Sequence, residues 1–127
     1  METLLIKATA RTPAIKFDPI QGKLEIKGRS IPENAAEFYK PLIEGLNKYV
    51  INPKPVIQVD IQLEYLNTDS ARCILNIFRL LESLQAKGNQ VNINWYYEKD
   101  DLDMKEVGED FREMVSLAFN LEQKKFS

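Results

Sequence analysis

Five short stretches of this sequence alternate apolar with polar side chains, and a period of two residues is typical of β-strands with one buried face. Their apolar positions are Leu4, Ile6 and Ala8; Ile15 and Phe17; Leu24 and Ile26; Ile57, Val59, Ile61, Leu63 and Tyr65; and Val91, Ile93, Trp95 and Tyr97. The residues between them are polar. We therefore expect a sheet that buries one face and leaves the other in water or free for a partner.

Three segments with helical spacing of apolar residues alternate with the later strands. The first is expected to begin at a capping motif, Ser30 to Glu33. The second runs from about residue 70 to 87, and the third lies within 101–117. This order predicts one α/β domain over residues 1–127, of the two-layer α+β kind. We expect a mixed sheet of about five strands with three main helices packed mainly on one face.

The chain has no histidine and one cysteine, which excludes internal disulfides, Cys/His zinc sites and any mechanism with an imidazole base. A net charge of −2, from 17 basic and 19 acidic residues, gives no electrostatic footprint for nucleic acid or an anionic membrane. The first residues do not resemble a signal peptide, and no apolar run approaches the ~20 residues that span a bilayer. We therefore expect a cytoplasmic protein that binds neither nucleic acid nor membrane.

The acidic run over residues 98–110 does not have the pattern of a calcium-binding loop. Counted from Asp101, glycine falls at the eighth position, Gly108, and the twelfth residue is Arg112. A solvated helix with acids near its N-terminus explains the run, and we expect no metal and no cofactor. Without histidine, the remaining route to acid–base catalysis is a pair of carboxylates, from Glu64 or from residues 100–110. These carboxylates show no distinctive arrangement in the sequence. We therefore expect no enzymatic activity.

The junction after the longest strand concentrates four residues with capping side chains, Asn67, Thr68, Asp69 and Ser70. One of them is enough to cap the following helix, which is worth about 1 kcal/mol. A hydroxyl at a helix start is also a favourable place for a phosphate, which brings about −1.5 to −2 charges to the surface. From the residues alone, capping is the favoured interpretation.

The chain resembles the SiaC family of bacterial regulatory phosphoproteins, whose fold is similar to that of STAS domains such as anti-sigma-factor antagonists. The matching stretches are Thr12-Pro13, Phe17-Asp18-Pro19, Gly22 to Ile26, Gly28 to Asn34, Phe38-Tyr39, Pro41-Leu42, Leu63-Glu64-Tyr65, Asn67-Thr68, Asn94 to Tyr97, Asp103-Met104, Glu106 and Gly108-Glu109-Asp110. They follow one another in order along nearly the whole chain. The resemblance therefore implies a STAS-like fold.

The resemblance implies that Thr68 is phosphorylated by a serine/threonine kinase, an ATPase of the anti-sigma type, and dephosphorylated by a metal-dependent serine/threonine phosphatase. The unphosphorylated form is then expected to bind and activate a diguanylate cyclase, which raises cyclic diguanylate and favours biofilm formation. Thr68 would combine helix cap and switch. The family usually has serine after this threonine, where the present chain has Asp69.

We expect the partner-binding residues to surround this threonine and to include one aromatic on the polar sheet face. They are Glu64, Asn67, Thr68, Asp69, Ser70, Arg72 and Tyr96. Two alternatives remain open. One is a partner-switching antagonist that binds an anti-sigma kinase, and the other, less favoured, is a small carboxylate-dependent enzyme.

Overall fold

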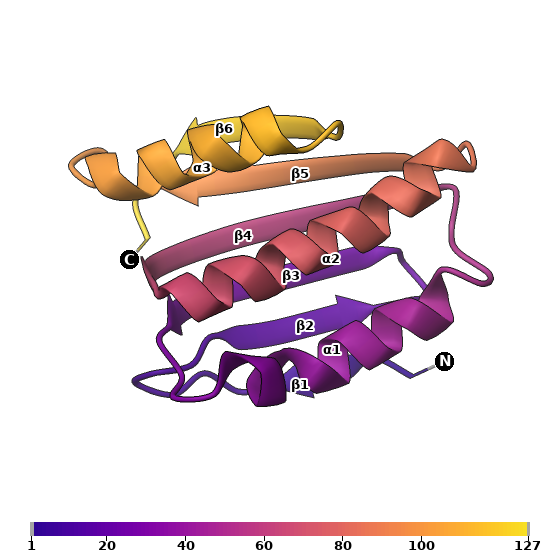
Figure 1. The fold of residues 1–127 in the computed structure, drawn as a ribbon, viewed down its shortest axis with the longest axis horizontal. Helices are drawn as coiled ribbons and strands as arrows, with labels where there is room; N and C mark the ends of the chain where they lie inside the picture. Colours follow the sequence, from indigo (N-terminus) through magenta and orange to yellow (C-terminus); the bar gives the residue numbers. More distant parts are fainter. Residues whose placement is uncertain (1, 127) are drawn as a thin grey trace.

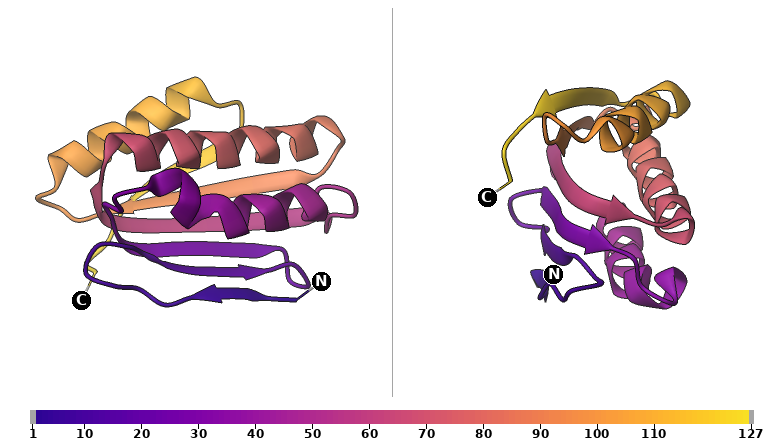
Figure 2. Two further views of the ribbon diagram at one scale, coloured as in Figure 1. Left: turned by 60° about the horizontal axis from the view of Figure 1, so that its bottom comes forward. Right: turned by 90° about the vertical axis from the view of Figure 1, so that its left-hand side faces the viewer.

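The computed structural model describes residues 2–126. In it, six strands form one sheet, and three helices cover one face of this sheet (Figure 1). The elements are β1 (Leu4–Ile6), β2 (Ala14–Asp18), β3 (Lys23–Ser30), α1 (Ala35–Tyr49), β4 (Val56–Leu66), α2 (Thr68–Ala86), β5 (Gln90–Tyr97), α3 (Leu102–Met114) and β6 (Ala118–Gln123). The end-on view in Figure 2 shows the helices on one side of the sheet, which confirms the predicted two-layer arrangement.

The strands lie in the sheet in the same order as in the sequence. β1, β2 and β3 are antiparallel neighbours, whereas β3, β4, β5 and β6 are parallel neighbours. The carboxyl ends of the four parallel strands therefore meet at one edge of the sheet. The turn between β2 and β3 is fixed by Asp18, whose Oδ1 accepts hydrogen bonds from the backbone N–H groups of Ile20 (3.0 Å) and Gln21 (3.1 Å).

The two faces of the sheet differ as the alternating pattern predicts. The inward side chains of β4 and β5 are buried, with Trp95 and Ile61 at 0% and 1% exposure. The outward face has a polar row across three strands. Asn94 Nδ2 donates to Asp60 Oδ1 at 3.0 Å, and Asn120 Nδ2 donates to Asn94 Oδ1 at 3.2 Å. Paired amides and carboxylates of this kind keep an uncovered sheet face compatible with water.

The sixth strand, β6, was not expected, because the last apolar segment was interpreted as a helix within residues 101–117 and no strand was predicted after it. The helix instead ends at Met114, and residues 115–121 alternate Val115, Leu117, Phe119 and Leu121 with Ser116, Ala118 and Asn120. Helical spacing fails there, while period-two spacing holds. The segment can therefore bury its apolar side against α2 and α3 only as a strand.

The start of the first helix also differs from the prediction. Its cap is Asn34, whose side chain accepts a hydrogen bond from the Glu37 backbone N–H at 3.2 Å. Ser30, the expected cap, is the last residue of β3 and pairs with Leu66 of β4. Pairing with the long β4 strand extends β3 to residue 30 and moves the helix start four residues along the chain.

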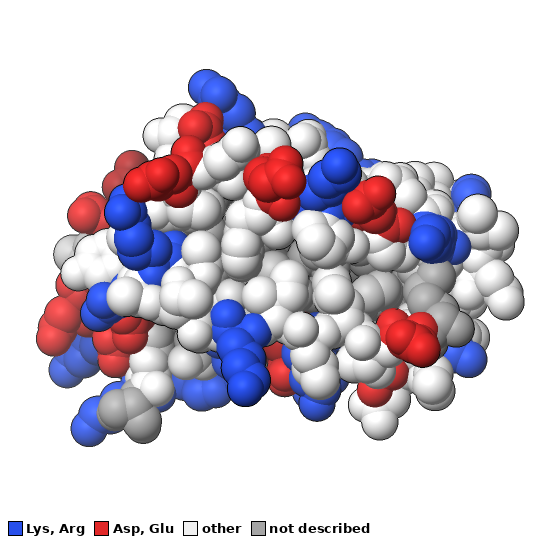
Figure 3. Space-filling view, turned by 90° about the horizontal axis from the view of Figure 1, so that it is seen from below, with Lys and Arg blue, Asp and Glu red and all other residues white. Residues whose placement is uncertain are grey.

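Acidic and basic side chains are mixed on the face seen in Figure 3, and neither sign forms a continuous patch there. This mixture agrees with the near-balanced composition of the chain. No helix within residues 2–126 has the length and apolar content that a membrane-spanning helix needs.

A close helix–sheet contact at Gly108 gives a test of the packing. A Cβ added at Gly108 of α3 would overlap the side chains of Trp95 and Leu121, whereas one added at Gly45 of α1 would meet only Phe17 at 4.0 Å. We expect Gly108→Ala to lower the free energy of unfolding by about 1–3 kcal/mol, because the core is overpacked. Gly45→Ala should raise it by up to about 1 kcal/mol, because alanine favours a helix. Urea denaturation measures both, and an unchanged Gly108→Ala variant would contradict the packing.

Candidate functional site

The Asn67 side chain and backbone tie the start of α2 to the end of β3. Asn67 Oδ1 accepts a hydrogen bond from the Ser70 backbone N–H at 2.9 Å, which caps the helix. Its Nδ2 donates to the Pro32 carbonyl at 3.1 Å, and its backbone N–H donates to the Ser30 carbonyl at 2.9 Å. These three hydrogen bonds of Asn67 thus hold the backbone of the next residue, Thr68, in place.

Thr68 is the first residue of α2 and is exposed. The prediction that Thr68 is itself the cap is wrong, because Asn67 has this role. Asp69 is also exposed, and its Oδ1 accepts a hydrogen bond from Arg72 Nη1 at 3.1 Å. Three of the predicted partner-binding residues, Thr68, Asp69 and Arg72, therefore form one polar surface at the start of the helix.

Ser70 was predicted to contact a partner, but its side chain is fully buried because the first turn of α2 directs it toward the sheet. Ser30 Oγ donates to Ser70 Oγ at 2.8 Å and lies 2.6 Å from the hydroxyl of Tyr39. Burial raises the pKa of Tyr39 to about 12. The three hydroxyls join β3, α1 and α2 directly beneath the exposed surface.

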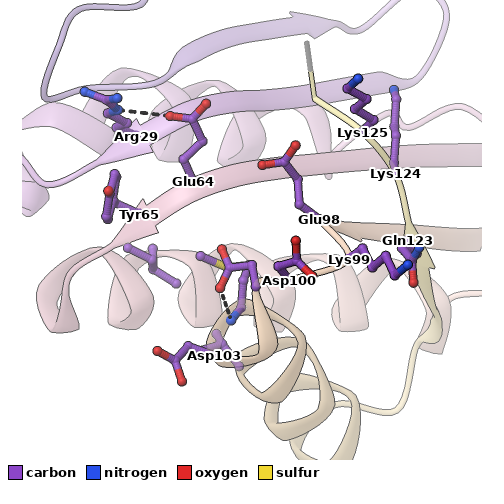
Figure 4. Close-up of a pocket in the computed structure, with 14 residues that line it drawn as sticks. Arg29, Glu64, Tyr65, Glu98, Lys99, Asp100, Asp103, Gln123, Lys124 and Lys125 are labelled. Atoms are coloured by element: carbon purple, nitrogen blue, oxygen red, sulfur yellow. Dashed lines mark hydrogen bonds and ion pairs between the residues drawn. The ribbon is translucent and has the colours of Figure 1, made fainter.

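A groove of about 1000 Å³ opens beside this junction, at the carboxyl ends of the parallel strands. Figure 4 shows Arg29, Lys124 and Lys125 along one side, and Asp100 and Asp103 near α3 on the opposite side. In open α/β sheets, ligands commonly bind outside the carboxyl ends of the strands. The groove is therefore a second candidate surface next to Thr68.

Glu98 lies between these two sides of the groove, and Lys99 lies beside Asp100 (Figure 4). The apolar part of the lining comes from the end of β4 and from α3, through Leu66, Met104 and Val107. Leu66 is only two residues before Thr68. A partner that occupies the groove would therefore lie close to the start of α2.

A β-bulge shapes the end of the groove. Gly28 pairs with Leu63, but the next residue, Arg29, pairs with Tyr65, so Glu64 is the extra residue. Gly28 has φ of +127°, a conformation that favours glycine. Arg29 Nε donates to Glu64 Oε2 at 3.0 Å, and its guanidinium lies 5.4 Å from the centre of the Tyr65 ring.

Sequence patterns missed Tyr65, Arg29, Lys124 and Lys125 of the groove, and the bulge accounts for Tyr65. Alternation along β4 places Tyr65 in the core, but the structure leaves it 56% exposed, because the register changes at Glu64. Arg29 was not singled out because nothing in its local pattern distinguishes it from other strand-end residues. Lys124 and Lys125 follow the strand β6, which was itself missed.

Tyr96 was predicted to be an exposed interface anchor, and it lies on the polar face of the sheet, half-buried. Lys124 Nζ is 4.9 Å from the centre of its ring. Burial, with Asp60 and Glu122 nearby, raises the pKa of Tyr96. Tyr96 does not line the groove but touches it through Lys124.

Three carboxylates of the groove have structural partners. Glu64 pairs with Arg29, Asp101 Oδ1 caps α3 by accepting the Met104 backbone N–H at 3.0 Å, and Glu98 accepts the backbone N–H of Phe126 at 3.2 Å. Among residues 2–126, no cluster of three or more His, Cys, Asp or Glu side chains is placed to hold a metal. These three carboxylates are thus already held by hydrogen bonds within the chain.

The fold and the site define a class: a small α/β domain with an exposed helix start and an open charged groove at one end of the molecule. The family model for SiaC family regulatory phosphoproteins matches residues 6–124, and the chain belongs to this family. An uncharacterized protein of Pseudomonas aeruginosa strain UCBPP-PA14 is 33% identical over 122 residues, which cover 96% of this chain and 97% of that protein.

Solved structures agree with the family assignment. Apo-SiaC from Pseudomonas aeruginosa has a TM-score of 0.90 at 33% identity, covering 98% of this chain and 100% of that one. SiaC crystallised with the diguanylate cyclase SiaD, of which it is described as the activator, also has a TM-score of 0.90, at 32% identity. That match covers 95% of this chain and 99% of the matched chain.

Measurements of unfolding free energy can test whether Asn67, and not Thr68, caps α2. We expect Asn67→Ala to lower the free energy of unfolding by about 1–2 kcal/mol, because it removes the cap and leaves the Pro32 carbonyl without its donor. Thr68→Ala should stay within about 0.5 kcal/mol of the unmodified protein, as is usual for exposed positions. Urea denaturation distinguishes the two, and an equal loss would argue against Asn67 as the cap.

The buried Tyr39 hydroxyl predicts a loss of stability in alkali. Its pKa is raised to about 12, so the folded protein keeps a proton that the unfolded chain releases near pH 10. Tyr39 therefore contributes this stability fully below pH 10 and loses it as the pH rises toward 12. Between pH 10 and pH 12, the free energy of unfolding of the unmodified protein should fall by about 2–3 kcal/mol more than that of Tyr39→Phe, as measured by urea denaturation. Parallel pH profiles would contradict the prediction.

Proposed function

We propose that this protein, in its unphosphorylated form, binds and activates a diguanylate cyclase, and that phosphorylation of Thr68 ends the interaction. The observation that carries the proposal is the exposed Thr68 side chain, held at the first position of α2 by the Asn67 cap and two residues from the groove lining. The similarity to SiaC, which forms a complex with a cyclase that it activates, supports the choice of partner. Raised cyclic diguanylate would then favour biofilm formation.

The position of Thr68 suits a switch that acts through charge. A phosphate would add about −1.5 to −2 charges beside the exposed carboxylate of Asp69. A partner that covers this surface would have to desolvate both groups, which weakens its binding. Arg72 lies four residues after Thr68 on the same face of α2, so it can offset part of the new charge.

Two enzymes would have to set the proposed switch. We propose a serine/threonine kinase, an ATPase of the anti-sigma type, as the enzyme that modifies Thr68, and a metal-dependent serine/threonine phosphatase as the one that reverses it. Both need access to the threonine hydroxyl. The exposure of Thr68 supports such access without local unfolding.

Incubation with the kinase and ATP should add one phosphate, which intact-mass and fragment mass spectrometry should place on Thr68. Thr68→Ala should remain unmodified and should still bind and activate the cyclase, whereas Thr68→Glu should bind at least about tenfold more weakly. Equal recovery of the cyclase by the two variants would contradict the switch. Recovery of an anti-sigma kinase as the stable partner would favour the alternative function.

A further inference from the structure

We propose that this chain forms a two-fold symmetric dimer in which β6 pairs antiparallel with β6 of a second copy, so that the two sheets become one. The inference goes beyond the proposed function, because it depends neither on Thr68 nor on a cyclase. It is carried by an outermost strand that is open to pairing and by a row of amide side chains that ends on this strand.

The long outer side of β6 is free to pair. β6 is the last strand at one side of the sheet, and α3 packs against β4 and β5 as well as β6, so the helix axis lies inward of this strand (Figure 1). Just after the strand, the backbone N–H of Lys124 donates to the Tyr97 carbonyl of β5 at 2.9 Å. Backbone groups alternate in direction along a strand, so those of Phe119, Leu121 and Gln123 point away from β5. Within residues 2–126 no further strand pairs with them, and they offer donors and acceptors to an incoming strand.

The sequence of β6 leaves most of this side unprotected. Natural proteins usually protect a free strand with charged side chains, with proline or by making the strand very short. Residues 115–121 contain no charged side chain and no proline, and charges follow only at Glu122, Lys124 and Lys125. The strand at the other side of the sheet, β1, has only three residues. The side along β6 is therefore the one that is open to another strand.

The polar row on the open face of the sheet ends at β6 with unused hydrogen-bonding groups. Asn120 Nδ2 donates to Asn94 Oδ1, and Asn94 Nδ2 donates to Asp60 Oδ1. Within residues 2–126 no group donates to Asn120 Oδ1. An asparagine amide has two donors and an acceptor with two lone pairs, so Asn120 can form further hydrogen bonds. A second Asn120 across a two-fold axis supplies both a donor and an acceptor and continues the row into the other copy.

A two-fold axis at Asn120 gives a register in which the side chains match. Antiparallel pairing about this residue places Phe119 opposite Leu121 of the other copy, and Ala118 opposite Glu122. Phe119 and Leu121 carry the free backbone groups, so they form the hydrogen-bonded pairs, and Asn120 meets itself at a non-hydrogen-bonded pair. Parallel pairing in register would instead place Glu122 beside Glu122, which is unfavourable because the charges are alike. The charge pattern therefore selects the antiparallel arrangement.

One pair of strands makes a weak interface. Stable interfaces bury about 1,200–2,000 Å² in total, and two strands of six residues do not reach this area alone. We therefore expect a dissociation constant on the order of 100 µM. Sedimentation velocity of the full chain should show mostly monomer at about 10 µM and mostly dimer at about 1 mM.

Disulfide trapping tests the register. Residues in a non-hydrogen-bonded antiparallel pair have Cα atoms about 4.5 Å apart, a distance that a disulfide can span. With oxidised glutathione, Asn120→Cys should form a disulfide-linked dimer, whereas Glu122→Cys should not, because its two copies lie about 14 Å apart. A mixture of Ala118→Cys and Glu122→Cys should form the mixed dimer that neither variant forms alone. The unmodified chain reports any background from Cys73, which is buried.

Matched lysine substitutions separate β6 from the rest of the open face. Asn120→Lys places two like charges on the axis and should raise the dissociation constant at least about tenfold. Gln58→Lys makes the same change of charge at an exposed position of β4 on the same face and should leave the dissociation constant unchanged. Thermal melting checks that each variant folds. If Asn120→Lys or Asn120→Cys does not fold, the mixture of Ala118→Cys and Glu122→Cys decides the register.

Three results would overturn the inference. They are a chain that stays monomeric at about 1 mM, an Asn120→Cys variant that cross-links no faster than Glu122→Cys, and equal dissociation constants for Asn120→Lys and Gln58→Lys. The last result would assign the dimer to another surface. None of these measurements includes the kinase or the cyclase, so their outcome is independent of the proposed function.

Discussion

The buried hydroxyl cluster beneath the start of α2 determines the geometry of the end of the protein that carries the candidate site. Ser30, Tyr39 and Ser70 come from β3, α1 and α2, and each hydroxyl has a partner inside the cluster. Leaving one of these groups unpaired in the core would cost about 1–3 kcal/mol, so the three elements can meet in few other ways. The Asn67 bonds to Pro32 and Ser30 add a second tie at the same place.

The topology of the sheet then places the groove next to this cluster. Because β3, β4, β5 and β6 are parallel, their carboxyl ends lie together, and the connection into α3 starts at the same edge. The bulge at Glu64 turns Arg29 and Tyr65 toward that edge. One end of the molecule therefore carries an exposed hydroxyl, a charged groove and an exposed tyrosine, while the other elements provide the core.

Much of the fold could be predicted from the sequence because period-two and helical spacing are local properties. The one-sided sheet, the three helices and the strands through residue 97 follow from them. β6 was missed because Val115 also fits the end of a helix, and only its continuation through Phe119 and Leu121 identifies a strand. The site was harder to predict. The burial of Ser70 depends on the direction of α2, and the exposure of Tyr65 depends on a bulge. Neither feature can be predicted from the residue types alone.

Because Asn67 caps α2 and Thr68 only carries an exposed hydroxyl, the structure limits how a phosphate on Thr68 could act. If Thr68 were the cap, a phosphate would alter the helix start itself, and the signal would be a structural change. With Asn67 as the cap and Ser70 buried, the backbone around residue 68 is held by bonds that do not involve the threonine side chain. Modification would then change the charge of a rigid surface, so any effect on a partner would have to arise at the contact itself. A partner positioned by the neighbouring groove would meet that charge directly, which links the two surfaces through proximity and requires no rearrangement of the fold.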